Sequence, residues 1–490
     1  MVSRSMYDDI KKAFPDKIIP QEQRFYNNVI IPCRDIYTNE PPWKQVKLSG
    51  LYGKGTRDMC MLNAAKSLCD EFSALSFSER LNITVSVDNN EGLTDKLQQY
   101  TDKVLEDNGF YFHMSEWLAY AYAMGGGLLK IYVKDGEPVI NYLTADNFYP
   151  AEYTNRRITG GFFRSTHVKN GTYYTVIEYF GLKGNAYSEY KVFSSRSESE
   201  LGTETSLEAL YGDDAPGALH EYVGMNEPMF MYFKPSGANN LDINSCLGLS
   251  VFANCTATLK ALDVAFDSFS REFVLGKKRI IVPSSCIRTV VDPETGNIQR
   301  YFDSDDEVYQ ALKCDEEKDL RITDNTTELR VEEHVAAINA LLKVLCGQTG
   351  LSAGTLSFEG NSMKTAKEVV SENSKTYRTM AAHKNMLSEV LIQLVRCLIY
   401  LGQTEELGLL PQINDFNVTV AFNDDVIEDD ETIIDRNIKL VEAGLKSRLS
   451  AVMEVLRCDE ETAKLELERI NAENAADVMN LAKDIVPDDA

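Results

Sequence analysis

The chain has 490 residues, of which 44% are hydrophobic and 26% charged, a balance typical of folded proteins and not of disordered ones. Its net charge of −25 argues against a broad basic surface that grips nucleic acid. No stretch approaches the roughly eighteen uninterrupted apolar residues of a membrane span, and the N-terminus has no apolar signal core. We therefore predict no membrane association. The length of the chain is sufficient for about two to four units with their own cores.

Catalytic and metal-binding patterns are missing from the sequence. The ten cysteines form no Cys-x-x-Cys pair, which predicts reduced cysteines in a cytosolic setting. No Gly-x-Ser-x-Gly, Walker loop or compact acid pair occurs. Five histidines lie far apart without ligand spacing: His113, His167, His220, His334 and His383. We expect no catalytic residue, no metal and no cofactor.

The first part of the chain predicts mixed structure. Residues 1–55 are punctuated by prolines and predict an irregular arm with short helices. Apolar spacing then predicts helices over 56–75, 94–107 and 110–124, with a strand over 81–87 between the first two. Gly125, Gly126 and Gly127 follow a helix and precede a strand, the reverse of a dinucleotide-binding turn, so they indicate a tight helix exit.

Alternating residues and two turn signals predict an antiparallel sheet over 128–193. The segment 194–214 is polar and acidic, which predicts an exposed loop.

Two apolar helices, over 247–275 and 332–346, are predicted to enclose a compact insert of short strands and acidic runs. A glycine- and serine-rich loop follows, and then an uninterrupted helix from about Thr365 to Gly402. At about 1.5 Å per residue, this helix would span roughly 55 Å, the width of a whole domain. A strand over 418–422 and helices from Asp430 onward complete the predicted elements.

The order of these elements resembles the portal proteins of tailed bacteriophages, particularly those of long-tailed phages that infect Gram-positive bacteria. Four stretches carry the resemblance: residues 122–133, Gly248-Leu249-Ser250, Gly350-Leu351-Ser352 with 363–369, and residues 422–445. The resemblance implies an α+β, mainly helical portal-type fold with one very long helix and small antiparallel sheets.

The resemblance also implies a division of the chain. An N-terminal arm (1–55) and the first part of the wing (56–246) lead to a stem helix (247–276), a clip (277–331) and a second stem helix (332–349). A tunnel loop (350–363), a long wing helix (364–413) and a crown (414–490) follow.

Three sets of candidate residues follow from this division. The DNA-channel set in the tunnel loop is Ser352, Gly354, Ser357, Phe358, Glu359, Gly360, Asn361 and Lys364. The ring-packing set on the stem is Leu259, Leu262, Phe266, Phe269, Phe273, Val335, Ile338 and Leu342. The docking set in the clip is Pro293, Glu294, Gly296 and Asn297.

By resemblance, the protein is a non-enzymatic virion component, assembled in the host cytoplasm and placed at one capsid vertex. Its expected partners are copies of itself in a closed ring, expected to be a dodecamer, the terminase, the head–tail connector, capsid and scaffolding proteins, and double-stranded DNA in transit. An acidic channel wall would repel the phosphates and leave DNA free to slide, whereas lysines would hold it. Two alternatives stay open: another structural virion protein, such as a minor capsid or connector protein, and a soluble acidic α+β enzyme.

Overall fold

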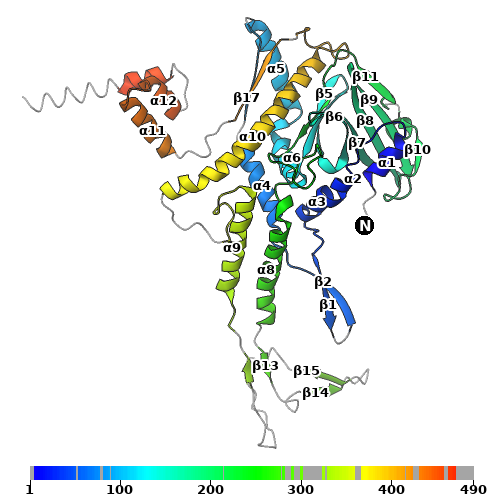
Figure 1. The fold of residues 1–490 in the computed structure, drawn as a ribbon, viewed down its shortest axis with the longest axis vertical. Helices are drawn as coiled ribbons and strands as arrows, with labels where there is room; N and C mark the ends of the chain where they lie inside the picture. Colours follow the sequence, from blue (N-terminus) through cyan, green and yellow to red (C-terminus); the bar gives the residue numbers. More distant parts are fainter. Residues whose placement is uncertain are drawn as a thin grey trace, which may run out of the picture. The chain divides into compact units, whose positions relative to one another are not determined.

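The computed structural model describes residues 5–50, 53–77, 81–88, 90–212, 215–276, 279–281, 288–291, 298–301, 323–325, 328–358, 366–413, 415–422, 430–456 and 462–470. The chain forms two compact units (Figure 1). The larger unit contains Met1–Ser76 and Ser86–Asn417, and the smaller contains Phe77–Val85 and Val418–Ala490. Long helices and small antiparallel sheets confirm the α+β fold class.

Residues 5–40 form short helices, as the sequence predicted, and many of their side chains are buried in the core of the larger unit. They form α1 (Met6–Ala13), the short α2 (Gln23–Phe25), a π-helical turn (Tyr26–Ile30) and α3 (Ile31–Tyr37). Phe14 packs on Phe162 at 5.4 Å between ring centroids, and Tyr26 stacks on Tyr149 at 5.1 Å. These buried aromatic contacts fix the segment on a sheet that lies more than a hundred residues further along the chain.

A β-hairpin occupies the place where the sequence predicted a helix start. Strand β1 (Gln45–Gly50) pairs antiparallel with β2 (Gly53–Asp58), and α4 begins only at Ala64 and runs to Ser76. Asn63 has a left-handed φ of 53°, which ends the extended segment just before the helix. The predicted helix at 56–75 is therefore eight residues too long at its start.

Helix α6 (Phe110–Met124) is central to the larger unit and has the predicted bounds. It packs with α4, α5 (Glu91–Asp107) and a three-stranded sheet of order β12-β4-β5. The strands are β4 (Gly127–Lys134), β5 (Glu137–Thr144) and β12 (Phe230–Phe233). Gly127 must be glycine because a Cβ there would lie 2.9 Å from the Trp117 ring. The glycines after α6 thus permit close packing, as the sequence indicated.

A second sheet, of order β10-β9-β8-β7-β6 with β11 also on β9, contains most of the strands predicted over 128–193. The predicted single sheet is therefore two sheets. The strands are β6 (Phe148–Thr154), β7 (Arg157–Lys169), β8 (Thr172–Lys183), β9 (Asn185–Ser195), β10 (Thr203–Thr205) and β11 (Leu219–Tyr222). Segment 194–214 is not only a loop, because it also contains β10 and the short helix α7 (Leu207–Tyr211).

Helix α8 (Thr256–Leu275) begins nine residues later than predicted, after a 3-10 turn at Ala253–Cys255. The preceding chain is held against the end of α6: Val251 donates its N–H to the Tyr122 carbonyl at 3.1 Å. A Cβ on Gly125, whose φ is 80°, would lie 2.6 Å from the Ser250 nitrogen. This contact keeps residues 248–252 out of the helix, and it joins two of the stretches that carry the portal resemblance.

Between α8 and α9 (Val331–Thr349) the described residues contain two strand pairs, β13–β16 and β14–β15. Their bounds are Arg279–Ile281 with Thr323–Asn325, and Arg288–Val291 with Ile298–Tyr301. A β insert between two helices agrees with the prediction.

Helix α10 (Ala366–Gly402) is the long helix that the sequence predicted, and it packs on α4, α5 and β12. Its stretch Lys375–Gly402 is long and apolar enough to cross a membrane by length and composition, but 56% of its most apolar window is buried inside the protein, as in a core helix. Burial also lowers the pKa of His383 to about 4, so its neutral ring accepts the Ser236 N–H at 3.0 Å. This helix is therefore the core of the larger unit.

The described part of the smaller unit contains a strand pair, the helices α11 (Asp430–Glu442) and α12 (Arg448–Leu456), and a helical stretch over 462–470. Strand β3 (Asn82–Ser86) pairs with β17 (Asn417–Ala421), and α11 packs on α12. Glu454 is bonded to both Arg436 and Lys446. The chain turns at Gly444, whose φ of 69° favours glycine.

Candidate functional site

The candidate site is the pair of helices α8 and α9 together with the loop that joins α9 to α10. The two helices lie side by side (Figure 1). Leu262 and Ile338 are fully buried, and Leu259 and Leu342 are nearly so. Burying such side chains stabilises a helix pair by about 1.5–3 kcal/mol each.

The eight predicted ring-packing residues therefore divide into two groups. Leu259, Leu262, Ile338 and Leu342 are covered within one chain, so they hold the stem pair together. The more exposed group lies nearer the insert: Phe266, Phe269 and Val335 are half-buried, and Phe273 is 44% exposed. Among these eight residues, the second group alone leaves apolar surface exposed.

An ion pair joins the two helices where they meet the insert. Arg330 donates Nε and Nη2 to Glu272 at 3.1 and 3.0 Å, and His334 lies 3.8 Å from the same carboxylate. These bonds hold the pKa of Glu272 below its usual range. Gly276 follows, where a Cβ would meet Leu329 at 2.4 Å. The chain thus leaves and re-enters the stem at one fixed point.

The start of the predicted tunnel loop is bonded to α10. Lys375 donates to the Gly347 carbonyl at 2.7 Å, and Thr379 donates to the Gly350 carbonyl at 2.8 Å. Thr376 accepts the Ser352 N–H at 2.9 Å and donates to the Ser352 hydroxyl at 2.8 Å. Ser352 is therefore buried and serves as an anchor, not as an exposed channel residue.

The described end of the loop folds back onto the stem. The Phe358 N–H donates to Asn339 Oδ1 at 2.8 Å, and its ring lies 6.4 Å from the rings of both Phe266 and Phe269. Gly354 is half-buried and Ser357 exposed. The structure thus brings Phe358 together with two ring-packing residues, which the sequence placed in a different set. Glu359, Gly360, Asn361 and Lys364, and the clip set Pro293, Glu294, Gly296 and Asn297, lie outside the described residues.

Two buried carboxylates on α8 form a feature that the sequence analysis missed. Asp263 accepts the Trp43 indole N–H at 2.9 Å and the Leu62 N–H at 3.1 Å. One turn later, Asp267 accepts Arg57 through two bonds of 2.7 and 2.6 Å and the Cys60 N–H at 3.0 Å. The signal was two acids four residues apart beside an apolar stripe. Together they fix the base of the β1–β2 hairpin to the stem.

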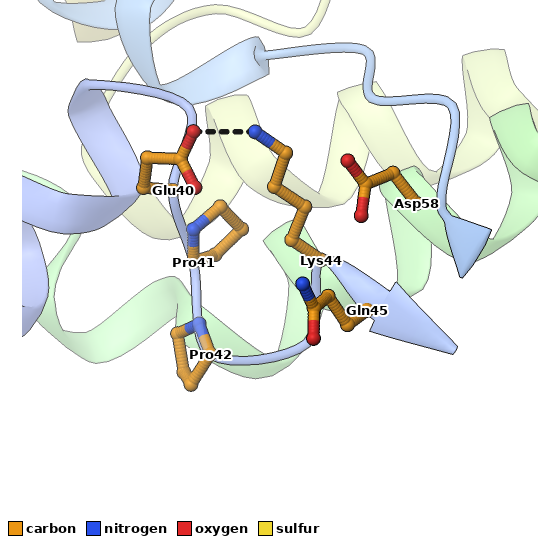
Figure 2. Close-up of a pocket in the computed structure, with 6 residues that line it drawn as sticks. All are labelled: Glu40, Pro41, Pro42, Lys44, Gln45 and Asp58. Atoms are coloured by element: carbon orange, nitrogen blue, oxygen red, sulfur yellow. Dashed lines mark hydrogen bonds and ion pairs between the residues drawn. The ribbon is translucent and has the colours of Figure 1, made fainter. Parts of the chain in front are cut away.

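Nothing in the described part of the chain supports catalysis. Near that hairpin a pocket is lined by Glu40, Pro41, Pro42, Lys44, Gln45 and Asp58 (Figure 2). Lys44 points toward Glu40 and forms an ion pair with it. Within the described ranges no group of three or more His, Cys, Asp or Glu side chains could hold a metal ion. The pocket's amine, on Lys44, is paired with Glu40, and no histidine, serine or cysteine lines the pocket.

A search of curated proteins finds no match. Two solved chains are similar to this one at 12% identity, each with 80% of this chain and 88% of the other covered. One is from the neck of an empty gene transfer agent (GTA) particle computed with C6 symmetry (TM-score 0.43), and the other is from the virion of a native GTA particle (TM-score 0.40).

The sequence matches the family described as phage portal protein, SPP1 Gp6-like, over residues 54–479. Portal proteins are structural virion components of the capsid portal vertex, form oligomeric rings and are not enzymes. Because the match covers most of the chain, this protein belongs to the SPP1 Gp6-like family of phage portal proteins.

Proposed function

We propose that this chain forms a closed ring, a dodecamer, whose central channel admits DNA during packaging and releases it at infection. The same ring would be the docking site for the terminase and the head–tail connector, and would contact capsid and scaffolding proteins during assembly. The observation that carries the proposal is the family match over residues 54–479. The order α8, β insert, α9, loop and α10 supports it, because this order is what the portal resemblance implied.

Within the ring we assign α8 and α9 to the stem and the strands between them to the clip. The larger unit's remaining elements, including α10, would form the wing, and residues 350–363 the tunnel loop. The C-terminal helices would belong to the crown. The clip is bounded by the Arg330–Glu272 ion pair, so a partner bound there would pull on both stem helices at once.

The net charge of −25 supports a channel that passes DNA of any sequence. Duplex DNA carries one phosphate charge per about 1.7 Å, and each lysine on the wall would release counterions and hold the duplex. Carboxylates repel phosphates and leave the duplex centred. An acidic protein is therefore suited to transport and not to storage of DNA by binding.

Electron microscopy of the purified full-length protein, followed by packaging into empty proheads with the terminase, tests the proposal. We expect rings with a central channel, and DNA protected from nuclease only when the protein is present. A protein that stays monomeric over a wide concentration range with its capsid partners present, or proheads that package equally without it, would overturn the proposal.

A further inference from the structure

The backs of the two stem helices are exposed and differ in character. On α9 one line of exposed residues falls in steps of four and three: Glu333, Ala337, Ala340, Val344 and Gly347, with the exposed Lys343 beside it. On α8 the corresponding set is Lys260, Val264, Ser268, Arg271 and Leu275, all exposed except the half-buried Arg271. One back is therefore acidic at one end and lined by small side chains, and the other is basic with branched apolar side chains.

Helix geometry places both sets opposite the contact between α8 and α9. At 3.6 residues per turn, Val264 lies roughly 160° around α8 from the buried Leu262 and roughly 140° from the buried Leu259. Ala340 lies by the same measure roughly 160° around α9 from Ile338 and Leu342. Val264 is 43% and Val344 is 49% exposed, so neither is covered within the chain. Each stem pair thus has two outer faces pointing in opposite directions.

The two faces also match in level along the stem. Thr258 is bonded to Gln348 at 2.8 Å, and Glu272 to Arg330 at 3.0 Å, which fixes the antiparallel alignment at both ends. Between these points, Val264 on α8 is level with Ala340 on α9. Arg271 is level with the first turn of α9, which contains Glu332 and Glu333. At the first level, the larger Val264 on α8 corresponds to the small Ala340 on α9. At the second level, the Arg271 cation corresponds to the carboxylates of α9.

We propose that in the ring the back of α8 of one subunit packs on the back of α9 of the next, with Val264 seated at Ala340 and Arg271 paired with Glu333. The occupant is a second copy because a cyclic ring needs two different, mutually complementary faces on each subunit. Rotation about the ring axis also preserves height, so residues that are level within one stem meet in neighbouring upright stems. This inference rests on the proposed ring and adds which faces close it.

Charge complementarity selects this arrangement over like faces meeting. Two α8 backs would oppose Arg271 and Lys260 to the same cations, and two α9 backs would oppose carboxylates to carboxylates. Like charges facing one another at an interface cost several kcal/mol, whereas opposite charges also steer the encounter. Alternation of α8 and α9 around the ring therefore has both the steric and the electrostatic advantage.

Cysteine pairing tests the seat at Ala340. In the full-length protein, Val264→Cys with Ala340→Cys should give, on mild oxidation of assembled rings, a ladder of covalent oligomers on non-reducing gels. The matched control is Val264→Cys with Glu333→Cys, whose sites differ in level by roughly 10 Å along the helix. This control should give a ladder at least about tenfold weaker. Each single variant should also give a ladder at least about tenfold weaker, and it shows how much crosslinking the native cysteines contribute.

Rings that form normally by microscopy without the Val264–Ala340 ladder would overturn this inference and leave the proposed function standing. If no rings form with the unaltered protein, the proposed function itself fails. A ladder of equal strength from both pairs would also refute the assigned register.

Charge reversal tests the proposed pair of Arg271 and Glu333. Two single variants and their double variant are compared, so the result does not depend on whether one variant folds. Arg271→Glu and Glu333→Arg should each raise the protein concentration needed for half-assembly by about tenfold or more, and the double variant should restore most of it. Helical content by circular dichroism should stay unchanged in all three. Failure of the double variant to recover assembly, with normal helical content, would contradict the pairing.

Discussion

Phe358, at the described end of the loop, packs against Phe266 in the middle of α8, with 6.4 Å between ring centroids and 64° between ring planes. The sequence placed Phe358 in the channel and Phe266 in the ring contacts. Because of this contact, the loop and the stem share one aromatic cluster. A substitution in the loop part of the cluster should therefore alter the packing of the stem part, and the reverse.

The Phe358 contact should hold the loop against the stem with an energy of about 0.5–1.5 kcal/mol, the usual range for an aromatic pair. Phe358→Ala should therefore increase local opening of the loop by about twofold to twelvefold. Hydrogen exchange of the residue-358 amide, which donates to Asn339 Oδ1, measures this opening. Ala353→Ser, in the same loop but away from the cluster, should leave the exchange rate unchanged. Equal exchange in the wild type and Phe358→Ala would show that the ring does not hold the loop.

Phe266→Asp should prevent ring assembly and give monomers or aggregates. The half-buried ring contacts both Phe269 and Phe358, and a carboxylate at its place would be desolvated without a partner. Light scattering and microscopy would follow assembly. The exposed Thr256→Asp change, in the first turn of the same helix and outside both the aromatic cluster and the back of α8, is the control for added charge alone. Normal rings from Phe266→Asp would contradict a role for this cluster in assembly.

Asp267→Asn should lower the free energy of unfolding at pH 7 by about 1–3 kcal/mol, because it weakens charged hydrogen bonds to Arg57. The Arg57 guanidinium lowers the pKa of Asp267, so its contribution is present above the unfolded pKa of about 3.9 and is lost as the pH falls through the lower folded value. Urea unfolding at pH 7 and in acid should show the difference from wild type shrinking.

Asp263→Asn is the matched comparison for that experiment. Burial raises the pKa of Asp263, so its ionised form already costs folding free energy at neutral pH. Its substitution should cost less than Asp267→Asn at pH 7. An equal or larger cost would mean that its bonds to Trp43 and Leu62 outweigh the desolvation.

Deleting Leu356 to Glu359 should leave rings intact by microscopy and reduce the amount or retention of packaged DNA. The deletion spares the anchors at Gly350 and Ser352, so the stem and α10 stay joined as before. Nuclease-protected DNA per particle is the measurement. If the deletion variant packages full genomes at normal yield, the loop only connects α9 to α10 and has no role in packaging.

Deleting Pro293 to Asn297 should spare ring formation and weaken capture of the terminase or of the connector. These residues lie in the insert, beyond the Arg330–Glu272 pair that closes the stem. Pull-down with each partner, beside microscopy of the rings, gives the two readouts. Unchanged capture would refute the clip as the docking surface.

The periodicity of apolar residues in the sequence was sufficient to predict the long helices. Helices α6 and α10 were predicted within one residue at each end, because uninterrupted apolar spacing and a terminal glycine mark them locally. The β1–β2 hairpin was missed because its strands contain Gly50, Gly53 and Gly55 and alternate only weakly between apolar and polar residues. Its position depends on Asp263 and Asp267, more than two hundred residues away in the chain.

The other elements were predicted less well because their pairing and their ends depend on contacts between segments that are distant in the sequence. Alternation identified strands after Gly127, but not that β4 pairs with Phe230–Phe233 and so belongs to a separate sheet. Helix α8 was started too early because residues 248–252 are apolar for packing on α6 and not for helix formation. The stem leucines were identified as buried residues, but whether their cover came from α9 or from a neighbour needed coordinates.

Gly350 determines where the chain can bend between α9 and α10. Its φ of 85° and the 2.6 Å approach of a Cβ to Thr379 Oγ1 exclude other side chains at the point where α9 ends. Three α10 side chains hold the chain from Gly347 to Ser352, so a pull on the loop beyond Ser352 is borne by α10 and not by α9. In the proposed ring, force applied to the loop would thus pass into α10, the longest helix among the described residues.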